Sequence, residues 1–181
     1  MTTPDVVELI ARAGADACRI VDAVAPEQWD KATPCQEWDV RRLVEHFIVS
    51  LEGIPTMMSG TMPDWERRID LGDDPTVAFS AAMATNQAFF ADADHATSEM
   101  RPGMRASDLD LTEIVVHAWD VAKATGQPPA LDQDAVDAAW AWASGMPAAM
   151  RAGGTAFGPE VDVPDNAPTL DRLVGLLGRT P

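Results

Sequence analysis

The residues best suited to chemistry lie in the segment 111–120, where a carboxylate and an imidazole are one helical turn apart. Glu113 and His117 are four positions apart in the sequence, so on an α-helix their Cβ atoms lie about 5–6 Å from each other on one face. That spacing suits two ligands of one metal ion. It also suits a simple pair between the two side chains, and Glu113 could instead be a first-turn carboxylate that meets the helix dipole.

The segment that carries this pair is apolar almost all round. Its apolar residues are Leu111, Ile114, Val115, Val116, Ala118, Trp119, Val121 and Ala122. A helix with no polar face is a buried one, and buried carboxylate and imidazole groups are costly unless something satisfies them. A divalent cation would do so, and so would an arginine together with a hydrogen bond.

His46 offers a third ligand from an earlier segment. On a helical wheel at ~100° per residue it lies about 120° from the centre of its apolar stripe. The small residues Ser50 and Gly53 follow along the same edge, which should leave space beside the imidazole. We therefore expect the site at one edge of the helical assembly rather than at its axis. Two histidines and one carboxylate leave coordination positions open, as in catalytic zinc sites, and the set also suits iron, nickel or manganese.

Two other residues with reactive or titratable side chains have alternative interpretations, and a third has a single interpretation. Asp120 either orients His117 through a hydrogen bond or is a surface charge beside Lys123. Cys35 either lines a pocket or is a small buried residue. His95 lies in a polar segment and is expected to be solvated. No residue is assigned as catalytic in the sense of reacting with substrate.

Composition excludes several functional classes. The chain has 13 Lys and Arg against 29 Asp and Glu, a formal net charge of −16, which disfavours nucleic acid and anionic membrane surfaces as partners. No apolar run approaches the ~20 residues of a membrane span, and no secretory signal is visible at the N-terminus. The two cysteines do not form a C-x-x-C pair. We expect a single cytoplasmic domain over residues 1–181, with a homodimer as an open alternative.

Helical periodicity accounts for most of the chain. The four long helices expected run from a Thr3–Pro4 start to about Val24, from an Asp39 cap to near Pro55, from Asp74–Pro75 to about Asp92, and from Asp108 or Asp110 to Gly126. Shorter helices are expected over 134–144 and 170–177, loops over 25–38, 60–74 and 153–168, and irregular structure or a short hairpin over 95–107. Four helices of roughly 18–22 residues, each about 30 Å long, predict an all-α four-helix bundle with extra short C-terminal helices.

Two blocks of sequence carry a family resemblance. They read TPCQEWDVRRLVEH over 33–46 and LTEIVVHAWDVAKATG over 111–126, and the tail adds AFGPEVDVP over 156–164 and LGRTP over 177–181. In this order they resemble the actinobacterial metal-binding proteins related to the N-terminal domain of mycothiol-dependent maleylpyruvate isomerase, within the DinB/YfiT-like superfamily.

The resemblance implies a DinB-like bundle with up-down-down-up topology. It also implies a divalent metal, zinc in the first place, held by His46, Glu113 and His117. The isomerase of this family has a further C-terminal domain that contributes to its active site, and no residues beyond Pro181 could supply one here. Isomerisation of maleylpyruvate is therefore not expected.

Relatives in the superfamily include S-transferases of low-molecular-weight thiols, which use the bundle alone. The function expected by resemblance is a metal-dependent thiol S-transferase, with mycothiol and a small electrophile as substrates. A non-catalytic metal-binding or stress-associated domain is the alternative. A hydrolase with a metal-bound hydroxide is a third hypothesis, weakened in its protease form by the absence of an H-E-x-x-H motif.

Overall fold

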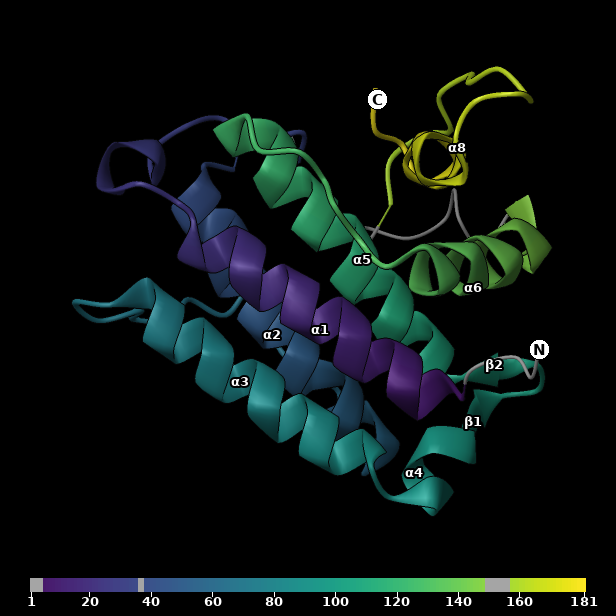
Figure 1. Ribbon diagram of the computed structural model, residues 1–181. Coiled ribbons are helices and arrows are strands. Elements are labelled where there is room, and N and C mark those ends of the chain that lie inside the picture. The colour runs from purple at the N-terminus through teal and green to yellow at the C-terminus, as the bar shows by residue number, and fades with distance from the viewer. Residues whose placement is uncertain (1–4, 36–37, 149–156) are drawn as a thin grey trace.

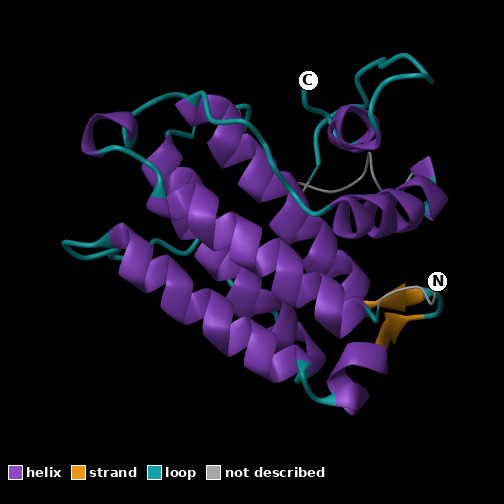
Figure 2. Cartoon of the chain, viewed as in Figure 1, coloured by secondary structure: helices purple, strands orange, loops and turns teal. Residues whose placement is uncertain are grey.

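Helices make up most of the chain in the computed structural model, which describes residues 5–35, 38–148 and 157–181 (Figures 1 and 2). The longer helices are α1 (Val6–Asp22), α2 (Val40–Met58), α3 (Pro75–Phe90), α5 (Ala106–Thr125), α6 (Gln133–Gly145) and α8 (Thr169–Leu176). The shorter elements are the 3-10 helix η1 (Pro26–Gln28), helix α4 (Ala93–Thr97), and strands β1 (Glu99–Arg101) and β2 (Met104–Arg105). The expectation of a mainly helical protein is confirmed, and among the helices described none is long and apolar enough to cross a membrane.

The four long helices pack against one another in pairs. Helices α1 and α2 each contact both α3 and α5, and α5 also contacts α6, which in turn carries α8. Figure 1 shows α5 between α1 and the α6–α8 pair, with the C-terminus beside α8. Helix α5 thus has neighbours on most sides, which explains why its sequence is apolar almost all round.

Aspartates cap the helices at their N-termini. The Asp5 carboxylate accepts a hydrogen bond from the Val7 amide, and Asp39 accepts one from the Arg42 amide at 2.7 Å. The cap of α1 is therefore Asp5; the expected Thr3–Pro4 start lies outside the described residues. Asp74 caps α3 and Gly126 ends α5 with φ 74°, both as expected from their residue types.

Four expected helix boundaries differ from the structure, and the first two are the ends of α1, at Asp22 rather than about Val24, and of α2, at Met58 rather than near Pro55. Helix α3 ends at Phe90 rather than about Asp92, and the short helix α4 follows. Helix α5 begins at Ala106, ahead of Asp108, because strand β2 runs directly into it after the antiparallel β1–β2 hairpin. The hairpin alternative for 95–107 is the one observed.

The core lies where these helices meet. The rings of Phe47 from α2 and Phe79 from α3 pack with their centroids 4.8 Å apart, and both side chains are fully buried. Burial of one such ring contributes about 1.5–3 kcal/mol. Phe47 also lies 5.5 Å from the ring of His117 on α5, so the apolar core forms one side of the polar site described next.

Candidate metal centre and its cavity

Helices α2 and α5 bring His46, Glu113 and His117 together. One donor atom from each lies within 4.8 Å of the others. The two imidazole rings are 5.3 Å apart and almost perpendicular, and His117 Nε2 is 3.0 Å from Glu113 Oε2. Residues from two separate parts of the sequence thus meet in a space that one cation could occupy.

Glu113 lies well inside α5, not in its first turn. The helix begins at Ala106, so the dipole interpretation of this carboxylate is wrong. Its contact with His117 is the expected pair at a spacing of four residues. Burial favours a raised pKa for Glu113, but the hydrogen bond and charge of His117 outweigh it and hold the pKa of Glu113 below its ordinary value.

His46 has the properties of a ligand that lacks a partner. Its buried Nδ1 atom makes no hydrogen bond of ordinary geometry within the described part of the chain, although the Trp65 backbone interacts with the ring, and its Nε2 lies 3.5 Å from Ser50 Oγ. Burial, reinforced by the charge of His117, lowers the pKa of His46 to about 4. The ring is therefore neutral near pH 7 and has a lone pair free for a metal. Two imidazole nitrogens and a carboxylate oxygen are a donor set that zinc accepts.

His117 is held from both ring nitrogens. Its Nδ1 faces Asp120 Oδ2 at 3.2 Å, opposite the Nε2 contact with Glu113. Burial acts to lower the pKa of His117, yet its hydrogen bonds to Asp120, Cys35 and Glu113 raise it well above the ordinary value. These contacts favour the protonated form of His117 in the absence of a metal, so a metal that bound Nε2 would have to displace a proton.

Asp120 is buried and is not the surface charge that one interpretation proposed. Its relative exposure is 0%. In addition to its contact with His117, Asp120 accepts a hydrogen bond from the Cys35 thiol at 3.2 Å. Arg179 donates to both carboxylate oxygens, from Nη2 at 3.0 Å and from Nε at 3.3 Å. Although burial opposes it, the contacts with His117 and Arg179 keep the pKa of Asp120 below its ordinary value. The hypothesis that Asp120 orients His117 therefore agrees with the structure.

A second group of donor atoms, from Cys35, His117 and Asp120, also lies within 4.8 Å of one another. It suits a metal ion less well than the first group. The guanidinium of Arg179 already contacts Asp120 at 3.0 Å and Cys35 at 3.4 Å, and two cations side by side in a buried place repel each other strongly.

A cavity of about 500 Å³ opens beside the first group of donors. Aromatic side chains form much of its wall, and the Trp38 ring lies 4.5 Å from that of His46. The lining residues are Pro34, Cys35, Trp38, His46, Ser50, Ile54, Trp65, Glu66, Leu109, Glu113, His117, Phe157, Gly158, Pro159, Gly178 and Arg179. A site with open positions next to such a cavity can admit a ligand to the metal.

The structure corrects two expectations about these surroundings. Gly53 does not leave open space: a Cβ there would lie 2.5 Å from a Trp65 ring atom, so this ring fills the gap. Ser50 does line the cavity, and so does Cys35, as one of its alternatives proposed. His95 is half-buried rather than solvated, since its ring stacks on Phe89 at 3.9 Å and its Nδ1 donates to the Phe89 carbonyl.

Arg179 and Trp65 are site residues that sequence reasoning missed. Both lie in segments without helical periodicity: Trp65 follows the end of α2 by seven residues and folds back on it, and Arg179 contacts Asp120, 59 positions earlier in the chain. For Arg179 a signal was present in the Gly178–Arg179 pair after a short helix, a common helix-ending pattern. Nothing in that pattern says which buried carboxylate the arginine reaches.

Comparison with known proteins gives a family and two relatives. The family described as mycothiol maleylpyruvate isomerase N-terminal domain matches residues 10–122. The uncharacterized proteins Rv0738 and MT0763 of Mycobacterium tuberculosis, from strains H37Rv and CDC 1551, are each 30% identical over 164 residues, 87% of this chain and 88% of the relative. No solved structure matches the chain. The family match includes all three donors of the candidate metal centre.

Proposed function

Since the chain belongs to the mycothiol maleylpyruvate isomerase N-terminal domain family, we propose that it is a divalent-metal-dependent thiol S-transferase that uses mycothiol. The observation that carries the proposal is the convergence of His46, Glu113 and His117 beside an aromatic-walled cavity. Three protein ligands leave positions for an exogenous ligand, whereas a structural zinc site uses four.

The proposed metal is zinc, with Ni²⁺, Fe²⁺ and Mn²⁺ as alternatives. His46 would supply a neutral imidazole, Glu113 a carboxylate oxygen, and His117 a ring nitrogen in its deprotonated form. Asp120 then holds the Nδ1 proton of His117, which fixes the tautomer and the ring plane. We also propose the DinB-like up-down-down-up bundle for α1, α2, α3 and α5, supported by the contacts of α1 and α2 with both α3 and α5.

The chemistry needs an activated sulfur and an electrophile nearby. A divalent ion in this site favours the deprotonated, nucleophilic form of a bound thiol. The side chains of Trp38, Trp65 and Phe157 line the cavity, where they exclude water and can pack on an apolar electrophile. The protein needs no separate general base for this reaction, which agrees with Asp120 being engaged by Arg179 and His117.

A conjugation assay tests the proposal. Zinc-loaded protein, mycothiol and monochlorobimane should give the thioether, with a new sulfur–carbon bond, loss of chloride and release of the thiol proton. His117→Ala should lose this activity together with its zinc, whereas His95→Ala should keep both, because His95 lies on Phe89 outside the site. A rate no higher than that of the metal-free protein would refute the transferase.

Metal content is measured separately, on protein purified without chelators or a histidine tag. We expect one ion per chain in the wild type and a sharp loss in His46→Ala and in His117→Ala. Unchanged stoichiometry in both variants would refute the ligand assignment. If the ion binds but added thiol produces no sulfur-to-metal absorption in the cobalt-substituted protein, the non-catalytic metal-binding function is the correct one.

A further inference from the structure

Arg179 is a buried cation with no assigned role. Its residue exposure is 6%, and it donates to Asp120, to the Leu177 carbonyl and to Cys35 Sγ. It lies beyond the family match, which ends at residue 122. Yet it lines the same cavity as the metal donors.

The end of helix α8 fixes this arginine in place. The Arg179 amide donates to the Val174 carbonyl and the Gly178 amide to the Gly175 carbonyl, the two bonds of a Schellman motif. Gly178 has φ 89°, and a Cβ there would lie 2.5 Å from Gly158 Cα. Only glycine fits at 178, so Arg179 enters the site from a rigid turn rather than from a loose tail.

Arg179 sets the charge of the cavity. Among the described lining residues it is the one Lys or Arg. A bound divalent ion and Glu113 together carry one positive charge, while Asp120 and Arg179 cancel each other at 3.0 Å. Glu66 also lines the cavity, but its side chain is 83% exposed and lies near Arg42, so water screens its charge. The site as a whole keeps one positive charge, and without Arg179 it would be neutral.

We propose that Arg179 makes the open metal position selective for an anionic ligand, such as a thiolate, over a neutral one. The inference rests on the proposed metal centre, and it names the property of the cosubstrate that the cavity recognises. Arg179 acts through charge and through Asp120 rather than as a ligand itself, so it is a positioning residue. At an effective dielectric constant of about 20, one unit charge several ångströms away changes an anion's affinity by about ten- to hundredfold.

The test uses cobalt-substituted protein and two simple probes, thiocyanate as an anion and imidazole as a neutral ligand. Binding is followed by the visible absorption of cobalt, without any turnover. Arg179→Gln should bind thiocyanate about ten- to hundredfold more weakly and imidazole with unchanged affinity. Compared with Arg179→Gln, Arg179→Lys should restore part of the thiocyanate affinity, because it keeps a positive charge while losing the two-point contact with Asp120. Asp120→Asn should change thiocyanate affinity in the opposite direction, since it leaves Arg179 uncompensated.

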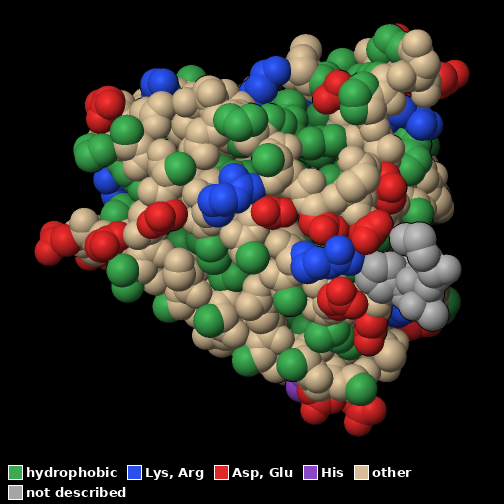
Figure 3. Space-filling model, in the orientation of Figure 1, with side chains coloured by type: hydrophobic (Ala, Val, Ile, Leu, Met, Phe, Trp, Pro, Cys, Tyr) green, Lys and Arg blue, Asp and Glu red, His purple; other side chains and the backbone are tan. Residues whose placement is uncertain are grey.

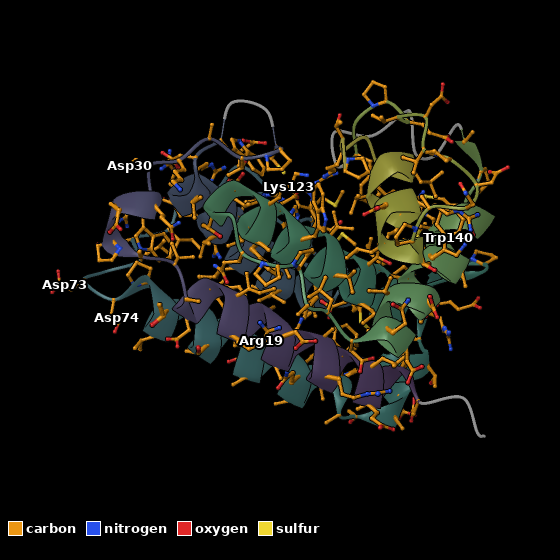
Figure 4. The ribbon with its side chains drawn as sticks, turned by 45° about the horizontal axis from the view of Figure 1, so that its top comes forward. Arg19, Asp30, Asp73, Asp74, Lys123 and Trp140 are labelled. Atoms are coloured by element: carbon orange, nitrogen blue, oxygen red, sulfur yellow. The ribbon has the colours of Figure 1, made fainter. Side chains whose placement is uncertain are left out.

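Arg172→Gln is the matched control. This arginine lies on α8, stacked over the Trp140 ring at 4.4 Å, and Trp140 lies at the α6–α8 contact in Figure 4. Arg172→Gln removes one positive charge from the same part of the fold, but the affinities for thiocyanate and imidazole should stay unchanged.

Each outcome bears on the inference. If Arg179→Gln weakens the binding of both probes equally, or of neither, the arginine has only a structural role and the inference is wrong. If this variant does not fold, failure of Asp120→Asn to tighten thiocyanate binding refutes it instead. A wild type that takes up no cobalt refutes the proposed function and the inference together. A wild type that shows the anion selectivity but binds no thiol refutes the transferase alone.

Discussion

His117 connects the two polar groups of the site. Its Nε2 contacts Glu113 and its Nδ1 contacts Asp120. A change in the position or protonation of either carboxylate therefore affects the other through this one imidazole ring. The four-residue spacing of Glu113 and His117 predicted their contact, since helix geometry alone determines it. The same logic could not reach Arg179, because its contact with Asp120 depends on how α8 ends and where it packs.

The pH dependence of metal binding follows from the pKa values of the two histidines. The pKa of His117 is raised, so the metal-free site carries a proton there at neutral pH and binding must release it. The zinc dissociation constant should rise about tenfold for each pH unit of acidification. Because the pKa of His46 is lowered to about 4, a second proton should compete only near that pH.

Competition with a chromophoric zinc chelator, between about pH 5 and 7, checks this slope. His95→Ala is the control, since it removes an imidazole outside the site and should reproduce the wild-type slope. A dissociation constant independent of pH over this range would contradict the proposed protonation of His117.

Asp110 predicts a second pH effect, on stability. It is fully buried, and its contact is a hydrogen bond from Asn86 Nδ2 at 2.8 Å. Burial raises the pKa of Asp110 well above the ordinary value. Between the pKa of the unfolded state and that of the folded state, the carboxyl group is therefore protonated in the folded protein and ionised in the unfolded one. The stability linked to this proton is present below the unfolded-state pKa of about 3.9 and is lost as pH rises through the folded-state pKa.

Asp110→Asn should therefore stabilise the fold at pH 7 by about 1–3 kcal/mol and have little effect near pH 4. Urea unfolding at the two pH values measures the difference. Asp73→Asn, at the exposed end of a loop in Figure 4, should have no such effect. A destabilised Asp110→Asn at pH 7 would mean that the ionised carboxylate is what the fold requires.

At the scale of the elements, the long helices and the shorter helices α6 and α8 were predictable from the sequence, whereas helix α4 was not. Helices α1 and α2 follow apolar stripes, and α3 begins at an aspartate–proline cap. The start of α5 was missed because its N-cap, Arg105, makes no capping side-chain bond in the described structure. Helix α4 and the β1–β2 hairpin are too short to show a period, and their packing on α5 stabilises them.

The packing of the Trp65 ring on α2 predicts the effect of a substitution at Gly53 on stability. Gly53→Ala would place a Cβ 2.5 Å from a Trp65 ring atom, so the ring must move and stability should fall by about 1–3 kcal/mol. Gly145→Ala is the control, because a Cβ there meets nothing within 4 Å. Urea unfolding compares the two, and equal stability of both variants would show that Trp65 does not pack tightly on α2.

At the scale of the whole molecule, the acidic surface and the proposed metal centre would affect stability in opposite directions. Acidic side chains are spread over the face drawn in Figure 3, and the formal net charge is −16. These like charges repel one another in the folded state, which lowers its stability. A cation bound at the proposed site between α2 and α5 would oppose unfolding of both helices, because the unfolded chain has no preformed site.

Zinc should therefore raise the free energy of unfolding by about 2.7 kcal/mol at a free concentration 100 times its dissociation constant. Thermal unfolding with zinc and with a chelator measures the shift. His46→Ala should abolish it, whereas Arg172→Gln should preserve it even if the baseline stability falls. An equal zinc shift in His46→Ala would place the stabilising ion elsewhere.

The position of Trp38, 4.5 Å from the ring of His46, has a practical consequence. Trp65 lines the same cavity, and the sequence contains no tyrosine, so tryptophan alone dominates the near-ultraviolet emission of this protein. A paramagnetic ion such as Co²⁺ in the site should quench the light emitted by these two indoles, and zinc, with its filled d shell, should not. The protein thus has an intrinsic optical reporter, which makes site occupancy visible without any added label.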